Sequence, residues 1–176
     1  MIHLHDKMFE PFISAEEIDF AISNLAKQMD DDFFEEVPVF IGVLNGSFMV
    51  LSDLMKKYRG MCEVSFVKMA SYEGTESTHD VKQLIGLNQS LENRTVVIVE
   101  DIVDTGNTIE ELKKILKGKN VKHLKIATLF FKPEAYKKDI KIDYIGIRIP
   151  NKFIVGFGLD YDGLGRNLPD VYQLAQ

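Results

Sequence analysis

Three carboxylates and a run of small polar residues stand together between an apolar run and an amphipathic segment. The acids are Glu100, Asp101 and Asp104, and the small residues are Thr105, Gly106, Asn107 and Thr108. Backbone N–H groups at a helix start can surround a phosphate with the help of the helix dipole. The two hydroxyls can add donors, and a glycine permits close approach or a positive φ. The segment therefore predicts an anion site.

Acids beside a bound phosphate would repel it unless they bind a cation or sugar hydroxyls. Glu100 and Asp101 suit both tasks, and hard oxygen ligands close to phosphate favour Mg²⁺. Asp104 lies nearer to the expected helix start, where it can accept a proton from a substrate. The alternative is that Asp104 or Thr105 only caps the helix and that the other acids are solvated. The chain lacks the G-x-G-x-x-G and G-x-x-x-x-G-K-[ST] nucleotide motifs.

Composition limits the classes of protein to consider. The chain has 176 residues and a net charge of −6, which favours one domain and argues against a general nucleic-acid surface. Cys62 is the single cysteine, so an intramolecular disulfide is impossible and a reducing cytoplasm is expected. The apolar runs fall far short of the roughly 18–20 residues that cross a bilayer, and the first residues do not resemble a signal peptide. No membrane partner is expected.

The elements that must position these residues alternate along the chain. Ser14 and Glu17 have the spacing of a capping box, and apolar residues follow on one helical face at Ile18, Ile22, Leu25, Ala26 and Met29. Strands are predicted at 37–44, 61–69, 96–100, 121–131, 142–147 and 153–158, with further helices after 47 and 107. Residues 70–93 read as a long polar loop. This order predicts an α/β fold with a mostly parallel central sheet flanked by helices. Ligands bind beyond the carboxyl ends of such strands, where the acids lie.

Four separated motifs resemble one family. Residues 96–109, VVIVEDIVDTGNTI, are similar to the phosphoribosyl-pyrophosphate signature of type I phosphoribosyltransferases, and the EDI-x-DTG form resembles the hypoxanthine(-guanine) branch. Residues 43–48 resemble the family's pyrophosphate-binding turn, and Ser71-Tyr72 resembles the pair on its mobile lid. Residues 149–156 and 159–161 resemble its purine-binding hood. The resemblance covers roughly residues 10–172.

The resemblance implies roles in binding phosphoribosyl pyrophosphate. Asp104, Thr105, Gly106, Asn107 and Thr108 are expected to hold the 5′-phosphate. Glu100 and Asp101 approach the ribose hydroxyls and the metal, Asp160 is a further metal ligand, and Asp104 is the general base near purine N7. The turn at Asn45 and Gly46 is expected to bind pyrophosphate together with Arg166. The family often has Lys or Arg where this chain has Asn45, which leaves a charged contact there in question.

It also implies a purine site. Lys132 is expected to reach the 6-oxo group and Phe153 to stack on the base, while main-chain groups around Ile154 and near Asp160 read the base edge. The alternatives are a surface lysine, a core phenylalanine and, for Arg166, a solvated charge. Tyr161 is assigned to packing.

The implied protein is one domain over residues 1–176, with a hood from the N-terminal and C-terminal segments and a lid at about 70–93. The implied reaction is Mg²⁺-dependent transfer of the 5-phosphoribosyl group to hypoxanthine, and also to guanine, giving IMP or GMP and pyrophosphate in purine salvage. A homodimer or homotetramer is expected. Two alternatives stay open: an enzyme that prefers xanthine, and a ligand-sensing regulatory protein with the same fold.

Overall fold

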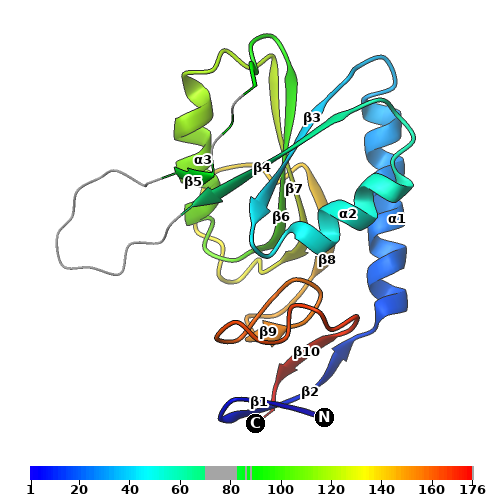
Figure 1. Cartoon of the computed structure of the whole chain (residues 1–176), viewed down its shortest axis with the longest axis vertical. Coiled ribbons are helices and arrows are strands. Elements are labelled where there is room, and N and C mark those ends of the chain that lie inside the picture. The colour runs from blue at the N-terminus through cyan, green and yellow to red at the C-terminus, as the bar shows by residue number, and fades with distance from the viewer. Residues whose placement is uncertain (70–82, 86, 88, 176) are drawn as a thin grey trace, which may run out of the picture.

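The computed structural model describes residues 1–69, 83–85, 87 and 89–175, and these form two sheets and three helices (Figure 1). The central sheet has the order β5-β4-β3-β6-β7-β8. Its strands β4, β3, β6, β7 and β8 are parallel, and β5 is antiparallel to β4. The predicted α/β class is confirmed. The elements are β1 (Ile2–Leu4), β2 (Lys7–Ile13), α1 (Ala15–Asp32), β3 (Val39–Leu44), α2 (Phe48–Lys57), β4 (Glu63–Met69), β5 (Gln83–Ile85), β6 (Thr95–Val103), α3 (Asn107–Lys117), β7 (His123–Phe131), β8 (Tyr144–Arg148), β9 (Ile154–Val155) and β10 (Val171–Leu174).

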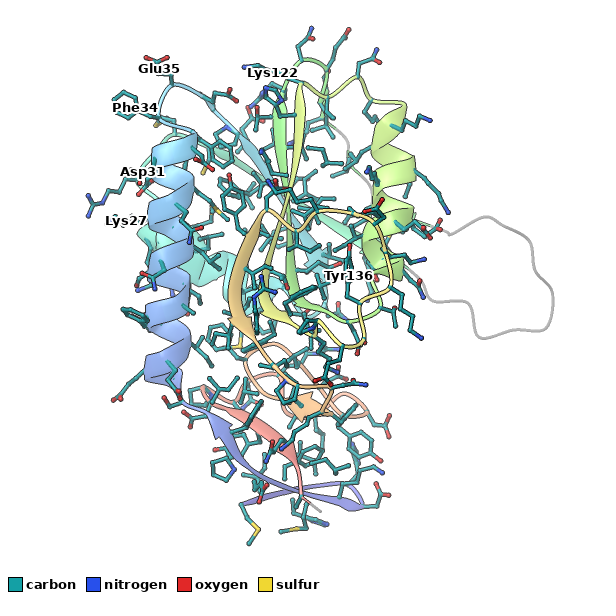
Figure 2. All side chains as sticks on the ribbon, turned by 180° about the vertical axis from the view of Figure 1, so that it is seen from behind. Lys27, Asp31, Phe34, Glu35, Lys122 and Tyr136 are labelled. Atoms are coloured by element: carbon teal, nitrogen blue, oxygen red, sulfur yellow. The ribbon has the colours of Figure 1, made fainter. Side chains whose placement is uncertain are left out.

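The first helix begins as its sequence predicts. The Glu17 backbone N–H donates to Ser14 Oγ at 3.3 Å, and the Ser14 backbone N–H donates to the Glu17 carboxylate at 2.9 Å. This capping box satisfies N–H groups that have no partner within the helix. The five predicted apolar positions are all buried, while Lys27 and Asp31 point away from the sheet (Figure 2).

Helices cover both faces of the central sheet. Phe40, Val97 and Val99 belong to the core that α1 and α2 complete, whereas Ile41 and Ile98 belong to the core that α3 completes. Figure 1 shows α3 on the side opposite to α1 and α2. Because successive residues of a strand point to opposite faces, burial on both faces explains the continuous apolar runs of β3 and β6.

Three sequence-based element boundaries were wrong. Strand β6 does not end at Glu100 but continues to Val103, since β7 pairs with it as far as Val103 opposite Phe131. The strand expected over 153–158 shrinks to β9, because positive φ angles at Gly156, Phe157 and Gly158 end it. The polar segment 70–93 contains the short strand β5.

The second sheet, in the order β1-β2-β10-β9, joins the two ends of the chain. It lies beneath the central sheet in Figure 1, with both termini at its far end. Strand β10 pairs with β2 on one side and with β9 on the other. Sequence patterns missed β1, β2 and β10; β1 and β10 have only three and four residues, and β2 pairs with β10 from the other end of the chain. None of the helices within the described ranges has the length and apolar character needed to cross a membrane.

Candidate active site

A cleft of about 560 Å³ lies at the carboxyl ends of the parallel strands. Its lining brings together the ends of β3, β4 and β6, the turn that contains Gly46, and the start of α3. This is the edge at which α/β sheets bind ligands. The predicted phosphate and acid residues that line it are Gly46, Glu100, Asp101, Asp104, Thr105, Gly106, Asn107 and Thr108.

The start of α3 is open toward this cleft. Gly106 is the N-cap residue with φ of +85°, and no side chain caps the helix. The alternative that Asp104 or Thr105 serves only as a cap is therefore wrong. A Cβ atom on Gly106 would lie 2.5 Å from the ring of Tyr136, so both the backbone angle and the space require glycine. The first N–H groups of α3 have no partner within the helix, and they suit an anion.

Glu100 and Asp101 are buried near the end of β6, with 6% and 9% of their surfaces exposed. Burial raises the pKa of Asp101 to about 6. Burial, reinforced by the neighbouring Asp101 charge, raises the pKa of Glu100 well above its ordinary value. Asp101 Oδ1 accepts a hydrogen bond from the Ile102 backbone N–H at 2.9 Å. Burial thus disfavours the charged form of both carboxylates.

The turn after β3 passes directly over these acids. A Cβ atom on Gly46 would lie 1.6 Å from Asp101 Oδ2, so no other residue fits here without a shift. Gly46 and its neighbour Asn45 therefore lie beside the acid pair, as a pyrophosphate turn near a metal would require. Ser47, at the start of α2, is completely buried, and its hydroxyl has no hydrogen-bond partner among the described residues.

Asp104 and Lys132 form an ion pair that sequence reasoning missed. Lys132 Nζ donates to Asp104 Oδ2 at 2.9 Å, and the Lys132 backbone N–H donates to Val103 O at 3.0 Å. Only 7% of Lys132 is exposed, so it is not a surface lysine. The two residues directly follow β6 and β7, which are parallel neighbours and end at the same edge of the sheet. That topology was a usable signal, because it places the residues after adjacent parallel strands together.

Asp160 and Arg166 form a second ion pair, at 2.7 Å between Oδ1 and Nη2. The Arg166 Nη1 group also donates to Gly158 O at 2.7 Å. A Cβ atom on Gly158 would lie 2.1 Å from Gly46 O, so the loop after β9 lies against the turn after β3. The charge of Arg166 lowers the pKa of Asp101 and that of Asp160 raises it, although burial has the larger effect. Both residues are therefore near the cleft.

The remaining predicted site residues are less closely gathered. Phe153 directly precedes β9 with 47% of its surface exposed, and Ile154 is buried in β9 opposite Gln173 of β10. Neither lines the cleft. Ser71 and Tyr72 lie outside the described residues.

The predicted metal ligands do not form a complete protein site. In the described part of the chain, no group of three or more histidine, cysteine, aspartate or glutamate residues is placed to hold a metal ion. Glu100, Asp101 and Asp160 thus do not gather into one protein cage. These three acids suit only a metal ion that takes most of its ligands from water and from a substrate.

Comparisons with known proteins give one consistent result. The family model described as "Phosphoribosyl transferase domain" matches residues 14–162. The hypoxanthine-guanine phosphoribosyltransferase of Staphylococcus aureus is 39% identical over 167 residues, which cover 94% of this chain and 93% of the relative.

Solved structures agree in fold and in sequence. The crystal structure of a hypoxanthine-guanine phosphoribosyltransferase from Bacillus anthracis has a TM-score of 0.88 and 36% identity, covering 94% of this chain and 98% of that one. A hypoxanthine phosphoribosyl transferase from Trypanosoma cruzi has a TM-score of 0.87 and 31% identity, covering 99% and 95%. The chain therefore belongs to the phosphoribosyltransferase family, in its hypoxanthine-guanine branch.

Proposed function

We propose that this chain transfers the 5-phosphoribosyl group from phosphoribosyl pyrophosphate to hypoxanthine and to guanine, producing IMP or GMP and pyrophosphate in purine salvage. The observation that carries the proposal is the cleft at the end of β6. It combines an uncapped helix start, a buried acid pair and Asp104, whose carboxylate is paired with Lys132 at the end of the adjacent strand. The names of the relatives from Staphylococcus aureus and Bacillus anthracis support the same reaction.

Phosphoribosyl pyrophosphate has two anionic ends, and the site offers a place for each. The N–H groups and hydroxyls of residues 104–108 suit the 5′-phosphate. The turn at Asn45 and Gly46, with Arg166 beside it, suits the pyrophosphate. Asn45 brings no charge to this turn, so Arg166 and a bound metal ion would neutralise the leaving group. Holding both reactants in one geometry also lowers the entropic cost of the reaction.

Mg²⁺ fits the acids that the structure places beside this turn. Magnesium is commonly bound by one or two carboxylates, with water and substrate phosphates as its other ligands. Glu100 and Asp101 are buried, and each has a raised pKa, so a divalent cation would stabilise their charged forms. Asp160 is the third proposed ligand and would exchange its contact with Arg166. When bound, Mg²⁺ would offset the negative charge that develops on the pyrophosphate.

The Asp104–Lys132 pair gives the purine half of the mechanism. A 6-oxo group can accept a hydrogen bond from the Lys132 ammonium, which then leaves the Asp104 carboxylate free to accept the N7 proton. As the C1–O bond to pyrophosphate breaks, the deprotonated purine attacks C1 through its other ring nitrogen. Phe153 would stack on the base, and main-chain groups at Ile154 and near Asp160 would read its edge. The segment with Ser71 and Tyr72 is proposed to close over the site and exclude water.

Two alternative functions remain to be separated from this one by experiment. The proposed partner of Lys132, the 6-oxo group, is common to hypoxanthine, guanine and xanthine, so an enzyme that prefers xanthine would use the same lysine. A regulatory protein with this fold would bind the ligand and a nucleic acid without turnover. The net charge of −6 argues against a nucleic-acid-binding regulatory protein.

We place the protein in the cytoplasm, in keeping with its single cysteine.

The proposed reaction is tested by supplying the purified protein with Mg²⁺, phosphoribosyl pyrophosphate and one base at a time. IMP and GMP should form from hypoxanthine and guanine, while xanthine, adenine and pyrimidines should be poorer substrates. Competition among the three 6-oxopurines then ranks them. Absence of nucleotide from both hypoxanthine and guanine would refute the proposal. Salt-sensitive nucleic-acid binding without turnover would favour a regulatory protein.

Replacing Asp104 by Asn should lower kcat by about 100-fold or more, because the general base is lost. Affinity for phosphoribosyl pyrophosphate, measured by calorimetry, should change far less, because the N–H groups of α3 remain. Asp139→Asn, an exposed acid in the segment after β7, is the matched control and should behave as wild type. Unchanged turnover in Asp104→Asn would rule out the base role.

Replacing Asp101 by Asn should stabilise the unliganded protein at pH 8 and weaken binding of Mg²⁺ with phosphoribosyl pyrophosphate. Burial raises the pKa of Asp101 from 3.8 to about 6. The stability contributed by the protonated group is therefore lost as pH rises through about 6. That shift corresponds to about 3 kcal/mol. The advantage of the variant in urea denaturation should shrink as pH falls from 6 toward 4. A variant less stable than wild type at pH 8 would contradict this account.

We also propose that the chain assembles as a homodimer or homotetramer. Phe48 of α2 and Val64 and Phe66 of β4 are 42%, 44% and 36% exposed. Phe66 lies close to Gly42 on the face that α2 covers, and Val64 points to the same face of β4. We infer that these exposed apolar side chains are buried between subunits. Light scattering should give a multiple of the 20.1 kDa chain mass. Phe66→Glu should shift that mass toward the monomer, and a monomeric wild type would refute the proposal.

A further inference from the structure

Phe153 belongs to a cluster of three aromatic rings. Its ring centroid lies 5.9 Å from that of Tyr161, at an interplanar angle of 85°, and 6.2 Å from that of Phe9. Phe9 and Tyr161 are themselves 6.1 Å apart. Edge-to-face contacts at such separations are favourable for aromatic pairs. Within the cluster, Phe9 is completely buried, whereas Phe153 is about half exposed.

Tyr161 is held by the turn between β1 and β2. Its hydroxyl donates to Asp6 Oδ1 at 2.7 Å, and the Lys7 ammonium lies 5.3 Å from its ring centroid. The ring of His5 meets it edge-on at 5.7 Å. These three residues precede Tyr161 by more than 150 positions, so the N-terminal hairpin closes on the loop after β9. Three groups of different chemistry, a carboxylate, an ammonium and an imidazole, thus fix one side chain.

The backbone of Tyr161 is fixed as well. Its N–H donates to Leu164 O at 2.9 Å, and the Leu164 N–H donates back to Tyr161 O at 3.1 Å. Asp160 precedes Tyr161 and is paired with Arg166 from the same loop. The ring of Tyr161 therefore has a fixed position relative to Asp160 and Arg166. Because it packs against the Phe153 ring, it also restricts the orientation of that ring.

Phe153 needs such support. A half-exposed phenylalanine that packs on one side can change rotamer at little energetic cost, and a moving ring makes a poor stacking partner. The contacts on its packed side that fix ring orientation come from Phe9 and Tyr161. Phe9 is a core residue, so its removal would disturb the whole second sheet. Tyr161 is the contact that can be altered selectively.

We propose that Tyr161 is a positioning residue for the purine: anchored by Asp6, it holds the Phe153 ring in the orientation that stacks on the base. This inference rests on the proposed function, because it assigns Phe153 to the base. It makes the N-terminal hairpin part of the purine site, although that hairpin contributes no side chain to the cleft. It also predicts that purine binding and phosphoribosyl-pyrophosphate binding respond differently to changes at Tyr161.

The test compares Tyr161→Ala with Tyr161→Phe in steady-state kinetics. The alanine variant should raise KM for hypoxanthine and guanine roughly three- to tenfold, with little change in KM for phosphoribosyl pyrophosphate. The phenylalanine variant keeps the ring and should restore most of the purine KM. Equal increases in both KM values, or no rescue by phenylalanine, would show a merely structural role.

A double-mutant cycle asks whether Tyr161 acts through Phe153. In a Phe153→Ala background, Tyr161→Ala should add little to the purine KM, because the ring that it positions is gone. Full additivity of the two changes would overturn the proposal. Should Tyr161→Ala fail to fold, Asp6→Ala supplies a milder loss of the anchor and should raise the purine KM in the same direction. An unchanged purine KM would then refute the anchor.

An NMR readout separates this proposal from the proposed function. Selective labelling of Phe153 reports the order of its ring without any reaction. Tyr161→Ala should broaden or average the Phe153 ring signals, whereas Tyr161→Phe should leave them near wild type. Unchanged signals in the alanine variant would refute positioning, whatever the enzyme does. Ordered signals in an inactive wild-type protein would refute the proposed function alone.

Discussion

The burial of two adjacent carboxylates in strand β6 is the constraint on which the site depends. Charged groups are costly to remove from water, and the raised pKa values of Glu100 and Asp101 express that cost. The strand cannot turn them outward, because β3 and β7 flank it and helices cover both faces of the sheet. The turn at Gly46 then closes over Asp101, at a distance that only glycine allows. The sheet therefore preserves a local electrostatic strain that a cation can relieve.

The second sheet adds what the parallel sheet lacks. Parallel strands place a helix start and acids at one edge, which suits the proposed binding of phosphate, ribose and metal. Strands from both ends of the chain form the second sheet, and the close approach of Gly158 to Gly46 joins the loop after β9 to the turn after β3. The hairpin that carries Asp6 therefore matters to the site through packing. On the proposed role of Phe153, a change in this hairpin would affect the purine through Tyr161 and Phe153.

The sequence predicted the parts of this protein that depend on local signals. The capping box at Ser14, the apolar face of α1 and the glycine at the start of α3 follow from spacing alone, and the structure has all three. The acids were found as a group, but they were placed in a loop, since an acid pair inside a buried strand contradicts ordinary strand composition. The second sheet was missed in most of its strands. The paired residues of β2 and β10 lie some 160 positions apart, and β1 and β10 are too short to show a period.

The four acids of the site differ in whether they have a salt-bridge partner. Asp104 is paired with Lys132, and Asp160 is paired with Arg166, so these two carboxylates already have a cation in the unliganded protein. Glu100 and Asp101 form no salt bridge among the described residues. An acid that is already paired can act only when a ligand takes its partner away, as a 6-oxo group would take Lys132. An acid without a partner instead attracts a cation from solution. The proposed base Asp104 and the proposed metal ligands Glu100 and Asp101 therefore differ in their surroundings, because β7 is followed by a lysine that pairs with Asp104 and no cationic side chain in the described part of the chain pairs with the other two.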